Sequence, residues 1–431
     1  MLDKIKNLKS VQKLSGKIPV GAGSDRLLVG LDIGTEYVKA LVAKLNGDEL
    51  EVIGVGRAHQ RLSDMQSGAV SDISGVVANC EKALTQAESM AGVSARQAVI
   101  GIAGELVKGL TTTVKYRRPN SEKPLDSAEL EVIVDRAQAR TLERAQKQLE
   151  LETGKKDVEV KLVNSAIVSI HIDTYKISNP IGFPGKEVVI QLYTAFAPMV
   201  HIGALERVAS ELDLDLIAVA AEPFAVSRSV IGADAASNLT AILIDCGGGT
   251  TDIAVVDDGG VMGTKMFGIG GRAFTKSIAN ELDLDFGHAE EVKIDLGKDS
   301  LNGADKARAL KAIDKTLAVW VDGVELALSE FTNVEHLPHR ILLCGGGSSL
   351  KALPEALKQQ QWYKDLPFTR KPTVELIEPD QVADIEDTTG RVTDHTMITA
   401  LGLLRVGYDT IIGSQGRSSR LKEKFNKILS V

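Results

Sequence analysis

The sequence lacks several features that mark common classes of protein. Its 431 residues include only three cysteines, scattered without the spacing of a disulfide framework or a metal site. No apolar run approaches the roughly 18 residues that span a bilayer, and the N-terminus lacks the apolar core of a signal peptide. A net charge of −8 argues against nucleic-acid binding by the body of the protein. We therefore expect a protein of a reducing, cytoplasmic compartment, unless its ends attach it to another structure.

The remaining composition is that of an ordinary globular protein. The chain is 44% hydrophobic and 25% charged, and it is long enough for two or more domains. Strand-like and helix-like segments are mixed, which predicts an α/β fold with two lobes. Strands are expected in a meander over 27–58 and at 98–103, 107–116, 160–172, 186–196, 216–220, 240–246, 253–257, 261–267, 340–344 and 373–377. Helices are expected at 72–91, 126–150, 202–212, 271–283 and 305–330.

The C-terminal segment differs from the body. Residues 417–431 place Leu421, Phe425, Ile428 and Leu429 on one helical face, beside five cations that include Arg420 and Lys424. A flexible tether is expected just before this helix, at 413–416. A basic amphipathic helix on a tether favours binding to an anionic membrane surface. The alternative is a terminal helix that packs on the body through the same apolar face.

The N-terminal arm, residues 1–25, is also basic, with apolar residues recurring every three positions. This spacing drifts around an α-helix, so disorder and a second weak membrane contact both remain open.

Glycine is concentrated in turns that follow apolar strands. Three of them read D-I-G-T at 32–35, D-C-G-G-G-T-T-D at 245–252 and G-G-G-S at 345–348. Such turns suit a tight hairpin, or a phosphate loop whose backbone N–H groups face an anion. Because two turns carry an aspartate at the same place, we predict two similar lobes facing each other. Asp32 and Asp245 would then hold a hydrated Mg²⁺ between the lobes.

This ordered set of turns resembles the superfamily of actin, heat-shock chaperones and sugar kinases. The three turns are similar to its first phosphate, second phosphate and adenosine motifs, and 218–228 and 395–404 are similar to its two connecting helices. The resemblance implies ATP and Mg²⁺ as ligands. The residues it implies for ATP binding are Gly34, Thr35, Lys39, Gly247, Gly248, Gly249, Thr250, Gly270, Gly271, Glu290, Lys293, Gly345, Gly346, Gly347 and Ser348.

The resemblance also implies roles for the charged residues. Lys39 would help the backbone N–H groups of the phosphate loops to hold the phosphates, and Glu290 would accept a hydrogen bond from the ribose. Lys293 would lie along the adenine, unless it is simply solvated. Glu222 is the candidate for orienting the attacking water, although a glutamate before proline also suits the start of a helix. Glu222, Asp32 and Asp245 are the candidate catalytic residues. The sequence leaves open whether they hydrolyse ATP slowly, as a step secondary to assembly.

Within the superfamily, the chain resembles the FtsA family of bacterial cell division. Residues 163–188 are similar to its inserted subdomain, called 1C, and the C-terminal helix is similar to its membrane-targeting tail. The pilus-assembly protein PilM shares a version of 1C. The segment 285–332 is short for the subdomain 2B of FtsA, which receives the C-terminal peptide of the tubulin-like FtsZ, so this partnership is in doubt.

The expected fold is therefore an actin-like ATPase fold with two lobes, duplicated mixed-sheet domains and a 1C subdomain in the first lobe. After the arm at 1–25, lobe 1 is expected at 26–95, 197–228 and 390–411, and lobe 2 at 229–284 and 333–389. The remaining segments are the 1C insertion at 96–196, the reduced 2B at 285–332, and the tether with the membrane helix at 412–431.

These features favour an ATP-dependent filament or adaptor of the division ring, attached to the inner face of the membrane. Such a protein would bind copies of itself and the anionic membrane surface. The alternative is a PilM-like, ATP-binding platform component of a pilus or secretion machine, which would not need the tail. A small-molecule kinase on the same fold fits the second phosphate motif less well.

Overall fold

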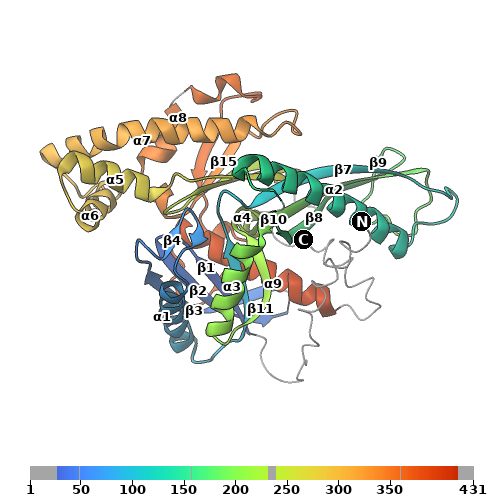
Figure 1. Ribbon diagram of the computed structural model, residues 1–431, viewed down its shortest axis with the longest axis horizontal. Coiled ribbons are helices and arrows are strands. Elements are labelled where there is room, and N and C mark those ends of the chain that lie inside the picture. The colour runs from blue at the N-terminus through green and yellow to red at the C-terminus, as the bar shows by residue number, and fades with distance from the viewer. Residues whose placement is uncertain (1–26, 48, 157, 232–238, 360, 416–431) are drawn as a thin grey trace.

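The computed structural model describes residues 27–47, 49–156, 158–231, 239–359 and 361–415. Two lobes lie one above the other in Figure 1, and a third unit extends sideways from them. The N-terminal arm, and the predicted membrane residues Leu421, Phe425, Ile428, Leu429, Arg420 and Lys424, lie outside the described residues. Within the described residues, no helix is long and apolar enough to cross a membrane.

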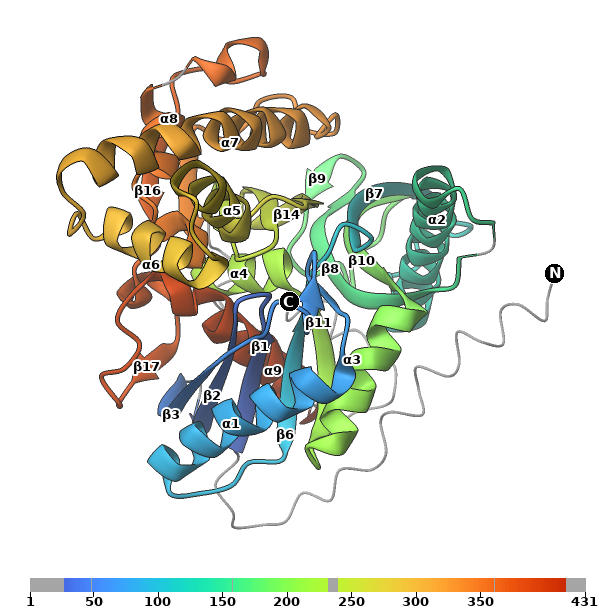
Figure 2. The ribbon, with the colours of Figure 1, turned by 60° about the vertical axis from the view of Figure 1, so that its left-hand side comes forward.

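Lobe 1 is built on a six-stranded sheet with helices on both faces. The strand order is β11 (Asp215–Ala221), β6 (Gln97–Ile102), β1 (Leu27–Ile33), β2 (Tyr37–Asn46), β3 (Glu49–His59) and β17 (Ile385–Asp387). Helices α1 (Ile73–Ala91) and α3 (Met199–Glu211) cover one face, and α9 (Ile398–Gln415) lies against the other (Figure 2). Helix α1 approaches β3 so closely that a Cβ atom at Gly56 would lie 1.8 Å from the carbonyl oxygen of Ala83.

Lobe 2 repeats this plan. Strands β16 (Thr373–Leu376), β15 (Arg340–Cys344), β12 (Ala241–Cys246), β13 (Thr251–Asp257) and β14 (Gly260–Phe267) lie side by side. The lobe also holds α5 (Gly271–Leu282), α6 (Phe286–Gly297), α7 (Gly303–Ser329) and α8 (Ala352–Gln359). Its core is separate from that of lobe 1 and contains the fully buried Trp320. The connecting helices α4 (Glu222–Ile231) and α9 pack against each other between the lobes.

The third unit continues the sheet of lobe 2. Strands β7 (Lys108–Arg117), β10 (Glu187–Pro198), β8 (Val160–Ile172) and β9 (Tyr175–Lys176) carry α2 (Ser127–Thr153) on one face, around a small core of their own. Strand β7 pairs with β14, so one nine-stranded sheet runs from lobe 2 through this unit. The smaller elements are β4 (Met65–Gln66), β5 (Ala69–Val70) and the 3₁₀ turns η2 (Gly346–Ser349), η3 (Trp362–Asp365), η4 (Pro379–Gln381) and η5 (His395–Met397).

Three predicted boundaries differ from the structure. The 1C insertion was expected from residue 96, but β6 pairs in parallel with β1 and belongs to the sheet of lobe 1. Strand β17 was expected in lobe 2, but it pairs with β3 in lobe 1. The predicted tether at 413–416 is wrong for residues 413–415, because α9 continues through Gln415. A glycine inside a helix costs about 1 kcal/mol, and α9 packs on lobe 1 through buried residues up to Ile411.

Candidate functional site

Two aspartate hairpins form the centre of the candidate site. In β1–β2, Asp32 lies opposite Lys39, and in β12–β13, Asp245 lies opposite Asp252. The Lys39 ammonium donates a hydrogen bond to Asp32 Oδ2 over 2.8 Å. Asp245 accepts a hydrogen bond from Thr399 on α9, which therefore ties the second hairpin to a connecting helix. All three aspartates are buried.

The turns of these hairpins touch across the two lobes. We call residues 34–36 loop 1 and residues 247–250 loop 2. A Cβ atom added at Gly249 would lie 2.7 Å from Thr35 Oγ1, and one added at Gly248 would lie 2.8 Å from Glu36 Cβ. Any side chain at these two positions would push the loops apart. The glycines therefore permit the backbones of the two predicted phosphate loops to approach each other closely.

The predicted adenosine motif packs directly against loop 2. Gly345 has a left-handed φ of +80°, and a Cβ atom there would lie 2.0 Å from Asp245 Oδ1. A Cβ atom at Gly347 would lie 3.1 Å from the carbonyl oxygen of Gly247, whereas Gly346 faces open space. The Ser348 hydroxyl donates to the carbonyl oxygen of Cys344, so it holds the turn to its strand.

The predicted ribose and base residues also lie together. Lys293 forms an ion pair with Glu290 at 2.7 Å and donates to the carbonyl oxygen of Gly271 at 3.2 Å. The hydroxyl of Thr275 donates to Glu290 over 2.5 Å. Gly270 packs on loop 2, because a Cβ atom there would lie 2.7 Å from the carbonyl oxygen of Gly247. The structure thus brings the segments carrying every ATP residue expected from the sequence to one place.

Glu222 begins α4 and is buried, with 8% of its surface exposed. The third unit supports the backbone around it. Asn164 Oδ1 of β8 accepts a hydrogen bond of 2.7 Å from the N–H of Ala221, and the ring of Tyr193 stacks on Phe224 with centroids 5.5 Å apart. Burial raises the pKa of Glu222 well above its ordinary value, and the nearby aspartates raise it further.

The two hairpins differ in their electrostatics. Burial lowers the pKa of Lys39, but the charge of Asp32, their hydrogen bond and the charge of Asp245 outweigh it, so the net pKa is raised. Burial raises the pKa of Asp245 and that of Asp252. Asp252 Oδ1 is buried and, among the described residues, has no hydrogen-bond partner. The lobe 2 hairpin therefore holds two buried carboxyls whose raised pKa favours their protonated forms, and its residues 241–257 include no lysine or arginine.

Sequence reasoning missed several residues of this site. Asp252 appeared only as the end of a motif, Thr399 lay unremarked in the second connecting helix, and Arg272 was not considered. Arg272 donates from Nε to Glu36 Oε2 at 2.7 Å and from Nη2 to the carbonyl oxygen of Thr35 at 2.6 Å. The position of Arg272 directly after Gly270 and Gly271 was the available signal.

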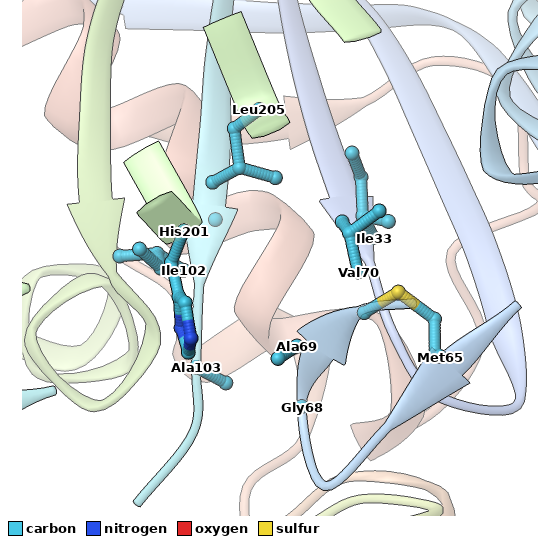
Figure 3. A pocket seen from close by; sticks show the side chains of 10 residues that line it. Ile33, Met65, Gly68, Ala69, Val70, Ile102, Ala103, His201 and Leu205 are labelled. Atoms are coloured by element: carbon cyan, nitrogen blue, oxygen red, sulfur yellow. The ribbon is translucent and has the colours of Figure 1, made fainter. Parts of the chain in front are cut away.

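A small pocket lies beside this site and does not contain it (Figure 3). It is lined mainly by apolar side chains from β1, the β4–β5 hairpin, the end of β6 and α3. Its polar side chain is His201, whose buried Nδ1 has no hydrogen-bond partner among the described residues. Burial lowers the pKa of His201. None of the predicted ATP residues lines this pocket.

Comparisons with known proteins bear on the family of this chain. A model of the family described as cell division protein FtsA matches residues 242–402. The cell division protein FtsA of Pseudomonas aeruginosa is 29% identical over 275 residues, and that of Neisseria meningitidis is 25% identical over 402 residues. The chain is related to the FtsA family. This confirms the resemblance seen in the sequence.

The extent of the match to the FtsA family differs between relatives. The alignment with the Neisseria protein covers 88% of this chain and 89% of that protein. The alignments with the FtsA proteins of Pseudomonas aeruginosa and Bacillus subtilis cover 63% and 64% of this chain, and 61% and 59% of those proteins. The chain thus spans about three fifths of the length of these two relatives. The matched segment 242–402 contains Asp245 and the adenosine motif but not Asp32 or Lys39.

Solved structures bear on the fold of this FtsA relative. A structure of the PilM–PilN type IV pilus biogenesis complex superposes with a TM-score of 0.63 at 18% identity. It covers 89% of this chain and 99% of that chain. At this identity the likeness concerns the fold alone. The fold is the actin-like ATPase fold, an α/β architecture with mixed sheets, as the sequence predicts.

Proposed function

We propose that this chain is an ATP-binding, actin-like protein of bacterial cell division that assembles with copies of itself on the inner face of the membrane. One observation carries the proposal. Two phosphate loops, the adenosine turn and the Glu290–Lys293 pair come from distant parts of the sequence and meet between two lobes. The relation to FtsA supports a setting in cell division.

The phosphates would bind where the loops converge. Backbone N–H groups of loops 1 and 2 are the anion ligands that glycine-rich turns supply, and Lys39 adds a positive charge beside them. Gly345–Ser348 would contact the adenosine, and Glu290 would accept a hydrogen bond from the ribose. Lys293 is held by Glu290 and the carbonyl oxygen of Gly271, so it supports this end of the site.

Magnesium fits the donor set through its waters. No group of three or more His, Cys, Asp or Glu residues in the described ranges is arranged to hold a metal ion directly. Asp32, Asp245 and Asp252 supply the carboxylate oxygens that hydrated Mg²⁺ prefers, and the unpaired Asp252 Oδ1 leaves a buried acceptor for a bound water. When bound, Mg²⁺ would neutralise phosphate charge.

Glu222 is our candidate for orienting the attacking water. When ionised, a buried carboxyl with a raised pKa is a stronger base than an exposed one, which suits Glu222 to accept a proton from water. Phosphoryl transfer depends mainly on positioning and charge neutralisation, so such a site supports slow hydrolysis. Assembly would then be the main use of the nucleotide.

The membrane contact would come from residues 417–431. Leu421, Phe425, Ile428 and Leu429 would enter the lipid surface while Arg420 and Lys424 meet anionic headgroups. A short helix binds weakly, but many copies along a polymer multiply that affinity. Residues 285–332, which hold α6 and α7, would be the reduced 2B, and an FtsZ-type peptide would be its partner.

Electron microscopy tests the proposal. The full chain and a chain ending at Gln415, the last residue of α9, are placed with Mg-ATP on an anionic lipid monolayer. We expect filaments on the lipid with the full chain and their loss from the lipid with the shorter one. Phe425→Glu, which keeps the length, should behave like the shorter chain. Monomers in every case, independent of lipid, would overturn the proposal.

A further inference from the structure

Arg272 contacts both phosphate loops. It lies in the first turn of α5, and its backbone N–H donates to the carbonyl oxygen of Gly248 at 2.8 Å. The N–H of Gly271 donates to the carbonyl oxygen of Gly247 at 2.9 Å. The start of α5 therefore holds loop 2 by its carbonyl groups. The N–H of Gly247 donates within the loop to the carbonyl oxygen of Thr250 at 2.9 Å, which leaves the N–H groups of Gly248 and Gly249 for another partner.

The side chain of Arg272 extends from lobe 2 to loop 1 in lobe 1. Its Nε and Nη2 reach Glu36 Oε2 and the carbonyl oxygen of Thr35 at 2.7 and 2.6 Å. The side chains of Arg272 and Glu36 are only 11% and 14% exposed. The other oxygen of Glu36 lies 2.7 Å from His59 Nε2, so the carboxylate is fixed from both sides. Charge-assisted hydrogen bonds with this little exposure are among the stronger contacts in proteins.

We propose that these contacts of Arg272 with Thr35, Glu36 and Gly248, which we call the interloop bridge, hold the two phosphate loops together and limit the rate at which nucleotide leaves. The inference rests on the proposed function, since it takes the phosphates to bind between the loops. A nucleotide held there leaves only when loop 1 separates from loop 2, and Arg272 has to give up its contacts with Thr35 and Glu36 before they separate. Arg272 is thus a positioning residue for the phosphates.

The geometry requires arginine at this position. The fork of a guanidinium donates to a side-chain oxygen and a carbonyl oxygen at once, whereas lysine ends in a single ammonium. Arg272→Gln removes the charge and the fork, and Arg272→Lys keeps only the charge. Arg340→Gln is the matched control, because Arg340 pairs with Glu375 at 3.2 Å between β15 and β16 of lobe 2, away from loop 1.

The first measurement is the release of a fluorescent ATP analogue from the full-length protein, chased with excess ATP. We expect release from Arg272→Gln to be faster by about tenfold or more, the effect of losing charge-assisted hydrogen bonds. Arg272→Lys should be intermediate. Arg340→Gln should stay within about twofold of the original protein, as exposed ion pairs contribute little.

The second measurement needs no nucleotide. Amide hydrogen exchange at 33–37 and 247–250 should be faster in Arg272→Gln and unchanged in Arg340→Gln. If the original protein fails to bind the analogue, the proposed function fails, and the exchange still decides whether the bridge holds the loops. Binding with unchanged release in Arg272→Gln would overturn the claim that the bridge limits release. Unchanged exchange would overturn the bridge itself.

Discussion

The two aspartate hairpins have the same geometry and opposite electrostatics. In each, the aspartate that closes the first strand lies directly across from a charged residue of the second. Asp32 faces Lys39 and is neutralised by a hydrogen-bonded ion pair of 2.8 Å. Asp245 faces Asp252, and burial raises the pKa of both carboxyls. The two hairpins therefore share one backbone geometry but differ in the charge of the residue that faces the aspartate.

This difference suggests where a cation acts. Buried carboxylates without a positive partner either take up protons or bind a cation. Lys39 of lobe 1 forms a hydrogen bond with Asp32 and acts on Asp245 through its charge alone. The hydrogen bonds to the lobe 2 carboxyls come from hydroxyl groups, from Thr250 to Asp252 and from Thr399 to Asp245. We therefore expect Mg²⁺ and protons to affect the lobe 2 hairpin more than that of lobe 1.

The strongest test of this difference between the hairpins is to remove the cation of lobe 1. Lys39→Met leaves Asp32 buried without its ion pair, and breaking a buried pair by removing one partner costs about 3 kcal/mol or more. We expect a loss of that size in the free energy of unfolding, measured by urea denaturation without nucleotide.

The control for this prediction is a surface ion pair. Lys306 lies 3.4 Å from Asp299, and both side chains are substantially exposed. Lys306→Met should therefore change the free energy of unfolding by no more than about 0.5 kcal/mol. If Lys39→Met costs no more than this control, the ion pair of lobe 1 does not distinguish the two hairpins.

A smaller effect is expected from relieving the charge of lobe 2. A carboxyl whose folded-state pKa is raised contributes stability that is complete below its unfolded pKa of about 3.9 and is lost as the pH rises through the folded value. Asp252→Asn removes one such group and lessens the repulsion on Asp245.

The stability of Asp252→Asn relative to the original protein should therefore increase as the pH rises from about 5 to 8. Urea denaturation without divalent ions, at several pH values, measures this difference. Mg²⁺ with ATP should reduce it, because a bound cation offsets the same charge. A difference that is flat with pH would contradict the electrostatic account of the lobe 2 hairpin.

Local patterns in the sequence predict most of the elements that carry the site. The strands before loops 1 and 2 are apolar runs that end in aspartate and glycine, and the structure places β1 and β12 there. The long helix expected at 305–330 is α7, Gly303–Ser329. These elements were predictable because periodicity and turn residues are local properties of the chain.

Contacts between distant segments were not predictable in this way. The pairing of β7 with β14 joins the third unit to lobe 2. It depends on Gly109, because a Cβ atom added there would lie 1.9 Å from Thr264 Oγ1. Nothing near Gly109 in the sequence indicates that partner. Arg272 and Asp252 were missed for the same reason, since their roles come from loop 1 and Asp245, which other parts of the chain supply.

The smallest predicted effect concerns the support behind the lobe 2 hairpin. Trp320 of α7 donates from Nε1 to Thr251 Oγ1 at 2.9 Å, and that hydroxyl lies 2.7 Å from the carbonyl oxygen of Ile269. This contact connects α7 to the first residue of β13, directly after loop 2. Trp320→Phe removes one buried hydrogen bond, which is worth about 1 kcal/mol. We expect a loss of that size in the free energy of unfolding, with faster amide exchange at 247–251.

Trp362→Phe separates the loss of a buried bond from the loss of this particular support. Trp362 is also buried and donates from Nε1 to the carbonyl oxygen of Leu357 at 3.1 Å, but it lies beside α8 rather than loop 2. The two variants should cost similar free energies of unfolding, and only Trp320→Phe should speed exchange at 247–251. Equal exchange in both would mean that α7 stabilises lobe 2 without acting on its hairpin. Faster exchange in Trp320→Phe alone would show that α7 supports the lobe 2 hairpin through this one contact.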